Sequence, residues 1–289
     1  MNEDISLCPI IKSIMKIPII LTIHGIYYSK EILNNFLSYI DKIIFVSENS
    51  KKYYNDVIKE LPLNNYIVIP NGIENPKDIL IEKNILKNSL NLPKDSKIIL
   101  YCSRLSINKS NLAKLFLESF NKIVSENRNT FAVIMGHGNY AKYINDLVYK
   151  INSELKENKI FILGNRFNTL NYYNDSDLII GTGRVALEAM SIGKAVISFG
   201  SNGIVNIVNN DTIQPMINSN FGDHSISSQQ LNDKLIIKKL SASTNLLINS
   251  NEKLKELGDF NKLYVKKFLS LDKLSEFYIK ICENEIPYE

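Results

Sequence analysis

The chain has 289 residues, enough for about two domains at roughly 150 residues each. Its 34 lysines and arginines against 30 aspartates and glutamates give a net charge of +4, spread along the sequence, which argues against an obligate nucleic-acid-binding protein. With 45% hydrophobic and 22% charged residues, the composition is that of a folded globular protein and excludes a disordered chain or a coiled coil.

The cysteines and the N-terminal residues indicate a reducing compartment. Cys8, Cys102 and Cys282 lie far apart, with no CxxC pair and no grouping with histidines, so neither a disulfide framework nor a metal site is expected. The first residues lack the positive charge of a secretory signal, and no apolar run reaches the roughly 18 residues of a membrane span. We therefore expect a cytoplasmic protein, with attachment to the inner face of a membrane left open.

The first third of the chain alternates β-branched runs with amphipathic stretches, which is typical of parallel βα units. Pro70-Asn71-Gly72 marks a turn at its end, and residues 73–95 form a connector with a short helix. The expected elements are helices over residues 6–16, 29–39 and 49–60 and strands over residues 18–23, 42–46 and 66–69.

A second series of the same kind follows and has the length of a full doubly wound α/β domain. After Gly203 the pattern weakens, and helices are expected near residues 227–246 and 272–284, the last with Leu271, Leu274, Tyr278 and Ile281 on one apolar face. The series contains strands over residues 97–102, 130–135, 159–163, 177–180 and 195–199 and helices over residues 110–127, 139–156, 168–174 and 184–191.

The stretch SDLIIGTGRVALEAMSIGKAVISF, residues 176–199, carries the clearest chemical signal. A strand meets Gly181-Thr182-Gly183 and a helix opens at Arg184, so backbone N–H groups and the helix dipole could hold a phosphate there. Glu188 lies on the same helix face and could reach ribose hydroxyls. The alternative is that the glycines serve helix–sheet packing and that Glu188 pairs with Arg184.

Other candidates follow neighbouring strands. Arg104 and Lys109 follow strand 97–102, at the edge where α/β sheets bind their ligands, so these cations could bind an anion. The alternative is that they are ordinary surface charges in a loop. Gly136-His137-Gly138 ends a strand at the same edge, and His24 ends the first strand of the N-terminal series. His224 has no partner that the sequence identifies.

Several ordered motifs together resemble the retaining glycosyltransferases of family 4, which have the GT-B fold. Ile69-Pro70-Asn71-Gly72-Ile73 resembles the interdomain PNG turn of that family, and SRLSINKS its "GRL…KG" loop. Met135-Gly136-His137-Gly138 is similar to its glycine turn, and GRVALEAMSIGKAVIS to its "EAMACGxPVI" signature. The match covers roughly residues 17–200, and the final helix resembles the one that crosses back to the first domain.

The resemblance implies roles for particular residues. Arg104 and Lys109 would bind the donor diphosphate, and Glu188 the nucleotide ribose. Gly136, Gly183, Arg184 and Val185 would line the donor site, and His24 would be the catalytic-site residue that hydrogen-bonds the donor sugar. Such enzymes usually need no metal or cofactor, so Asp175-Ser176-Asp177 is interpreted as a capping or turn segment. A UDP-sugar is the expected donor.

The chain departs from the family pattern at three places. Ile180 stands where the family has a first glutamate, so a sugar contact is absent or supplied by Arg184, and Ser103 replaces a glycine. The first series has three strands, about half of the family's N-terminal domain, so roughly 80–100 residues of βα units would be lacking. An open half-sheet with an exposed edge and an uncovered apolar face is then expected.

The resulting prediction is an α/β, GT-B-like fold with two Rossmann-like doubly wound domains, the N-terminal one truncated. Residues 1–88 would form the partial acceptor-side domain, residues 96–262 the nucleotide-sugar-binding domain and residues 263–289 the helical segment that packs back.

The predicted function is transfer of a sugar from a nucleotide donor to a glycan or lipid-linked acceptor in cell-surface polysaccharide synthesis. The alternatives are a catalytically silent or split-subunit nucleotide-sugar-binding module that needs a partner chain, and a nucleotide-sugar 2-epimerase, which would need further acidic and histidine residues in the cleft. Peripheral membrane contact is a further hypothesis, based on Lys234, Lys238, Lys239, Lys262, Lys266 and Lys267.

Overall fold

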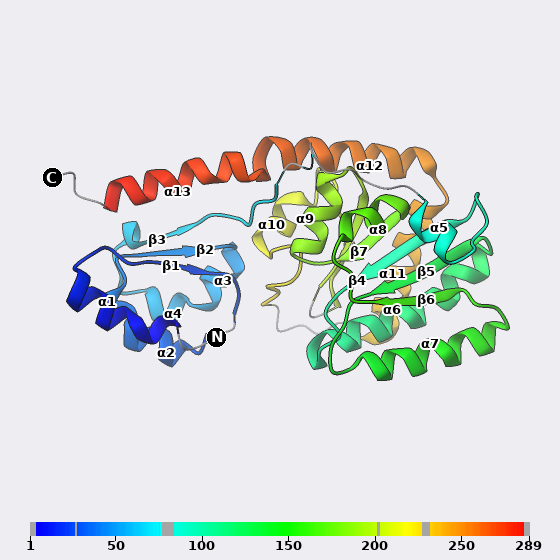
Figure 1. Cartoon of the computed structure of the whole chain (residues 1–289), viewed down its shortest axis with the longest axis horizontal. Coiled ribbons are helices and arrows are strands. Elements are labelled where there is room, and N and C mark those ends of the chain that lie inside the picture. The colour runs from blue at the N-terminus through cyan, green and yellow to red at the C-terminus, as the bar shows by residue number, and fades with distance from the viewer. Residues whose placement is uncertain are drawn as a thin grey trace.

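The computed structural model describes residues 4–26, 28–74, 76, 84–200, 203–226 and 232–285. Two α/β units lie side by side, and a long C-terminal helical segment runs from the second unit back over the first (Figure 1). Among the described residues, no helix is both long and apolar enough to cross a membrane.

The N-terminal unit is built on a three-stranded parallel sheet. Its strands β1 (Ile20–Ile23), β2 (Lys42–Phe45) and β3 (Tyr66–Val68) are ordered as in the sequence, with Ile20 opposite Lys42 and Ile43 opposite Tyr66. The α-helices of this unit are α1 (Cys8–Met15), α2 (Lys30–Phe36), α3 (Glu48–Tyr53) and α4 (Asn55–Ile58), and short 3₁₀ turns are η1 (Asp4–Leu7), η2 (Leu37–Tyr39) and η3 (Leu63–Asn65).

The second unit contains a six-stranded sheet in the order β6-β5-β4-β7-β8-β9. The first five are parallel, and β9 pairs with β8 in the antiparallel direction. The strands are β4 (Lys97–Cys102), β5 (Thr130–Met135), β6 (Ile160–Gly164), β7 (Leu178–Gly181), β8 (Ala195–Phe199) and β9 (Val205–Ile207). The helices are α5 (Ile85–Ser89), α6 (Ile107–Glu126), α7 (Ala141–Leu155), α8 (Thr169–Asp175), α9 (Arg184–Ser191), α10 (Ile213–Asn218), α11 (Asp233–Ile248) and α12 (Asn251–Tyr264).

Helices cover both faces of this larger sheet, as the near-continuous apolar strands require. Alternate residues along β4 face opposite sides: Ile99 packs with α6, α7 and α11, whereas Ile98 packs with α8, α9 and α10. This two-sided core positions the loops at the carboxyl ends of β4, β5 and β7 at one edge of the sheet, where ligands bind in folds of this kind.

The chain passes between the two units twice, once in the linker near Ile73 and once near Ser270, and these two segments lie side by side. Ile73 of the linker pairs with Ser270, with hydrogen bonds of 3.0 Å from Ile73 N to Leu269 O and from Leu271 N to Ile73 O. Beyond α12 the chain passes through a π-helical turn (Val265–Leu269) into α13 (Leu271–Glu285). Leu274 and Ile281 of α13 pack on Ile44 and Ile69 of the N-terminal unit.

The structure therefore confirms the α/β fold class and the helix that crosses back, but one expectation about the first sheet was wrong. Both of its faces are covered among the described residues, one by η1, α1, α2 and α4 and the other by α13. The uncovered apolar face does not exist, because the C-terminal segment supplies its cover. β1 remains an edge strand, paired with β2 alone in the described part of the sheet.

Three elements in the least periodic part of the sequence were not expected. Strand β9, helix α10 and helix α12 were not predicted, and the helix expected at residues 227–246 is α11, which begins at Asp233. Residues 227–231 of that expectation lie outside the described residues. The expected helix over residues 49–60 is divided into α3 and α4 at Tyr54.

Candidate functional site

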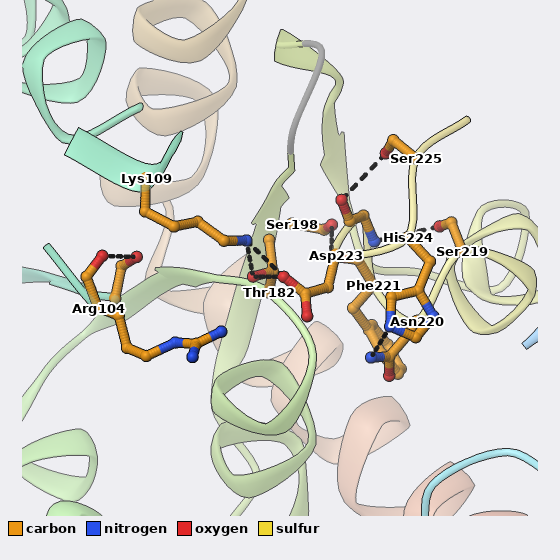
Figure 2. A network of polar contacts seen from close by, with 12 residues as sticks. Arg104, Lys109, Thr182, Ser198, Ser219, Asn220, Phe221, Asp223, His224 and Ser225 are labelled. Atoms are coloured by element: carbon orange, nitrogen blue, oxygen red, sulfur yellow. Dashed lines mark hydrogen bonds and ion pairs between the residues drawn. The ribbon is translucent and has the colours of Figure 1, made fainter. Parts of the chain in front are cut away.

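The loop between β4 and α6 carries the two predicted phosphate ligands. Lys109 lies in the first turn of α6, where its ammonium forms an ion pair with Asp223 and lies 3.4 Å from Thr182 Oγ1. Arg104 is exposed, and no ion pair involves it within the described ranges. Figure 2 shows both cationic side chains extending toward the loop that contains Thr182.

At the same edge of the sheet, close packing requires a glycine at position 136. Gly136 has a φ of +143°, and a Cβ at this position would lie 1.9 Å from the carbonyl oxygen of Ser103, the residue before Arg104. A Cβ at Gly138 would lie 2.4 Å from the carbonyl oxygen of Leu105, also too close for a side chain. The two glycines therefore let the β5 loop lie directly against the loop that bears Arg104.

The β7–α9 turn forms the centre of the site. Gly183 is the N-cap of α9 with a φ of +53°, and its N–H donates to Asn220 O at 3.2 Å. That N–H is thus already engaged, and Val185 N donates to Thr182 O at 3.1 Å, so the helix dipole and the N–H of Arg184 are what this turn offers an anion. Val185 packs against Gly181, where a Cβ would lie 2.4 Å from Val185 Cγ1.

Glu188 is held by two side chains. Its Oε1 accepts from Arg184 Nε at 2.7 Å and its Oε2 from Thr169 Oγ1 at 3.1 Å. The Glu188 side chain is 16% exposed, whereas that of Arg184 is 81% exposed. Ile180, at the position of the family's first glutamate, is fully buried in the core on the α6 side and cannot meet a ligand.

A cavity of about 490 Å³ opens beside Glu188. It lies between the second unit and the linker, since Gly72 and Leu271 contribute to its wall. The remaining lining residues are Ile73, Glu74, Phe167, Asn168, Thr169, Leu170, Asn171, Arg184, Glu188 and Ser191. Its size and mixed apolar and polar walls suit a small organic ligand.

A polar turn over residues 219–224, called the 219–224 turn below, connects this site to the N-terminal unit. Asn71 Nδ2 of the linker donates to Asn220 Oδ1 at 3.3 Å, and Asn49 Nδ2 of α3 donates to His224 O at 3.0 Å. Figure 2 shows Asp223 in contact with Lys109 and Thr182, with His224 and Asn220 paired beside it. The carboxylate of Asp223 also lies 3.5 Å from Thr182 Oγ1.

His224, for which the sequence identifies no partner, has partners on both units. It is fully buried, and its Nδ1 lies 2.9 Å from Ser47 Oγ while its Nε2 lies 3.4 Å from Asn220 Nδ2. Burial lowers the pKa of His224 because it disfavours the charged imidazolium, and Asp223 and a hydrogen bond with the His24 backbone oppose that effect. The exposed residue His24, at the end of β1, therefore lies next to this turn.

Asp175 and Asp177 have structural roles at the other end of the sheet. Asp175 accepts hydrogen bonds from Asn84 N at 2.6 Å and Leu86 N at 2.9 Å, which caps α5. Asp177 accepts from Ile98 N at 2.8 Å and pairs with Lys97 at 3.0 Å. Both carboxylates are thus engaged in fixing the starts of α5 and β4, in agreement with the capping interpretation.

Sequence reasoning missed Thr169, Asp223 and the partners of His224. Thr169 has no signal beyond its place at the start of a helix. Asp223 lies in an Asn-rich segment, and only the turn-forming Asn220-Phe221-Gly222 could have marked it.

The chain belongs to the family described as glycosyl transferases group 1, whose family model matches residues 82–256. It is 29% identical over 190 residues to the lipopolysaccharide 1,2-N-acetylglucosaminetransferase of Salmonella typhimurium, covering 58% of this chain and 46% of that protein. It is 26% identical over 181 residues to an uncharacterised glycosyltransferase of Methanocaldococcus jannaschii, covering 59% and 43%. The chain thus spans about half the length of the curated relatives that it matches.

Solved glycosyltransferase structures share the fold. The crystal structure of Anabaena HepE in complex with UDP and glucose superposes with a TM-score of 0.71 at 17% identity, covering 98% of this chain and 76% of that one. A glycosyltransferase from Rickettsia africae gives a TM-score of 0.69 at 18% identity, covering 98% and 80%. These similarities establish the GT-B-like arrangement of the two units.

Proposed function

We propose that this chain is a glycosyltransferase that takes a sugar from a UDP-sugar and transfers it to a glycan or lipid-linked acceptor with retention of configuration. The observation that carries the proposal is the meeting of Lys109, the start of α9 and Glu188 at one edge of the second sheet. Membership of the glycosyl transferases group 1 family supports it. No cofactor or metal is part of the proposal.

The site could assist departure of a nucleoside diphosphate. Negative charge develops on the diphosphate as its bond to the sugar breaks, and fixed positive groups stabilise that charge. Arg104, Lys109 and the α9 N-terminus supply such groups. Glu188, oriented by Arg184 and Thr169, would accept hydrogen bonds from ribose hydroxyls, so the nucleoside would occupy the cavity beside it.

The sugar would lie toward the N-terminal unit, near His24. That residue ends β1 and adjoins the 219–224 turn, so it lies across from the phosphate-binding groups. A histidine there could hydrogen-bond the sugar close to its reactive carbon. The acceptor would approach from the N-terminal unit, and the name of the Salmonella relative makes a lipopolysaccharide-type glycan a reasonable class to assay.

Calorimetric titration with UDP and GDP tests the donor site. We expect saturable binding of UDP that weakens at least about tenfold in Glu188→Gln and in Arg104→Ala combined with Lys109→Ala, since each removes charged hydrogen bonds. Lys114→Ala, on the same helix as Lys109, is the matched control because Lys114 pairs with Glu118 away from the site. A folded chain that binds neither nucleotide would contradict the proposal.

A second candidate is a nucleotide-sugar-binding subunit that acts with a partner chain. It is favoured by the edge strand β1 and by the adjacent α1, whose Ile10, Ile14 and Met15 are 55%, 75% and 60% exposed. A structural neighbour at a TM-score of 0.65 is itself a GtfA/B complex. Hydrolysis of a UDP-sugar by the purified chain alone would favour the enzyme, whereas binding without turnover would favour the subunit.

A further inference from the structure

The backbone of the 219–224 turn is strained and firmly held. Asn220, Phe221 and Gly222 have φ values of +48°, +51° and +81°, and such a run is unusual because side chains disfavour positive φ. Ser198 Oγ donates to Phe221 O at 2.7 Å, and Gly222 N donates to Ser219 Oγ at 3.1 Å. The next residue, Asp223, is therefore presented from a fixed position.

Asp223 puts a carboxylate inside the proposed anion site. One oxygen pairs with Lys109, and the other lies 3.6 Å from the place where a Cβ on Gly183 would be. The side chain is only 19% exposed. A phosphate bound between Lys109 and the start of α9 would thus lie close to a negative charge that works against its binding.

This repulsion is stronger for a free nucleoside diphosphate than for a sugar nucleotide. A terminal phosphate carries nearly two negative charges at neutral pH because its second pKa is about 6. Esterification to a sugar removes that second ionisation and adds hydroxyl groups, which donate hydrogen bonds to carboxylates. The same carboxylate therefore disfavours the product and tolerates or contacts the intact donor.

We propose that Asp223 is a specificity-determining residue that makes the site prefer the sugar-bearing donor over the free nucleoside diphosphate. This inference rests on the proposed function. In a transferase, such a preference limits occupation of the site by the product. The preference comes from the charge of Asp223 and its fixed position beside Lys109 and Gly183. The nucleoside cannot produce it, because both ligands have the same nucleoside.

The test is the ratio of the dissociation constants for UDP and for UDP-glucose or UDP-N-acetylglucosamine, whichever binds the wild type more tightly. In Asp223→Asn we expect UDP to bind about tenfold more tightly, with the sugar nucleotide unchanged or weaker, so that the ratio falls about tenfold. Inorganic pyrophosphate, which has no nucleoside or sugar, should also bind the variant more tightly. Asp223→Glu keeps the charge and should keep the wild-type preference.

Asp211→Asn is the matched control because this carboxylate is exposed outside the turn, and it should change neither constant. Asp223→Ser, with thermal unfolding of each variant, replaces Asp223→Asn if that variant does not fold. An unchanged ratio in a folded Asp223 variant of a chain that binds UDP would overturn this inference alone. A wild type that binds neither UDP nor a sugar nucleotide would overturn the proposed function, and the inference with it.

Discussion

Both oxygens of the Glu188 carboxylate are held by neighbouring side chains, one by Arg184 and one by Thr169. The contact with the exposed Arg184 is a surface i,i+4 pair, which contributes little free energy and so holds the carboxylate less firmly. The Thr169 contact comes from another helix, α8, and fixes the carboxylate relative to the cavity. The orientation of Glu188 therefore depends chiefly on a residue that no sequence motif marks.

Replacing Thr169 with valine tests this dependence. Valine keeps the shape and removes the hydroxyl donor, so we expect UDP to bind roughly three- to tenfold more weakly, the worth of one hydrogen bond. Arg184→Met should weaken it less. Isothermal titration gives both constants, and equal affinity in Thr169→Val and wild type would mean that Glu188 does not need this contact.

Gly136 and Gly164 form a matched pair for backbone strain. Both have positive φ, but a Cβ at Gly136 would collide with Ser103 O, whereas nothing lies within 4 Å of one at Gly164. We expect Gly164→Ala to lower the free energy of unfolding by about 1 kcal/mol and Gly136→Ala by about 3 kcal/mol or more. Urea denaturation measures both, and similar losses would show that the close approach to Ser103 relaxes easily.

The buried imidazole of His224 makes stability depend on pH in a defined direction. Its folded-state pKa is lowered from 6.5, so below about pH 6.5 the unfolded chain binds this proton and the folded chain resists it. The free energy of unfolding should therefore fall as the pH drops from 7.5 to 5.5, by up to about 1.4 kcal/mol per pH unit from this group. Urea denaturation across this range should give a shallower dependence for His224→Asn than for the exposed His137→Asn. Equal slopes in the two variants would exclude His224 as the source.

At the scale of elements, α13 connects sequence-distant parts of one fold. Its apolar stripe, with Leu274 and Ile281 buried at 5% and 8% exposure, completes the core on one face of the first sheet. The sequence showed this stripe as apolar residues spaced three to four apart. It did not show which part of the protein the stripe packs against, because periodicity indicates only that a face is buried.

Leu274→Ala should lower the stability of the N-terminal unit by about 2–4 kcal/mol, because it leaves a cavity against Ile44 and Ile69. Phe277→Ala, on the same helix at 51% exposure, should change stability by under about 1 kcal/mol. Hydrogen exchange of β1 to β3 reports the unit directly. Equal effects of the two changes would contradict the packing role of Leu274.

The limits of prediction at this scale follow from local chemistry. Strands β4, β5 and β8 agreed with their expected ranges because buried parallel strands are uninterrupted apolar runs bounded by turn residues. Strand β9 and helix α10 are short and lie among asparagines, so neither has a period that stands out. Helix α12 exposes much of its surface, and the helical spacing of Leu254, Leu257, Phe260 and Tyr264 is the signal by which it could have been found.

For the whole molecule, the sequence indicated the family and the sheet edge that carries Arg104, Lys109 and Glu188. It could not indicate Asp223 or the partners of His224 on the N-terminal unit, because these contacts join residues 175 or more positions apart for His224 and 114 apart for Lys109 and Asp223. The His224 contacts depend on how the two units are placed and the Lys109–Asp223 pair on how the second unit folds, and no local pattern encodes either.

One face of the molecule remains a candidate for membrane contact. Lys266 and Lys267 are exposed beside Leu263 and Phe268, which are 64% and 48% exposed. We expect the chain to float with vesicles of phosphatidylcholine and phosphatidylglycerol at low salt, and Lys266→Glu with Lys267→Glu to reduce binding at least about tenfold. Lys238→Glu with Lys239→Glu on α11 should have a smaller effect. Equal binding by both double variants would remove this face from consideration.

The return of α13 to the first sheet also has a consequence for synthesis on the ribosome. The described core of the second unit ends with Val265 and Leu269, whereas the first sheet lacks one of its covers until residues 271–285 are made. Of the two units, the one that is translated earlier therefore finishes folding later. During most of translation, the apolar surface around Ile44 and Ile69 has no cover from α13, and a chaperone could bind it.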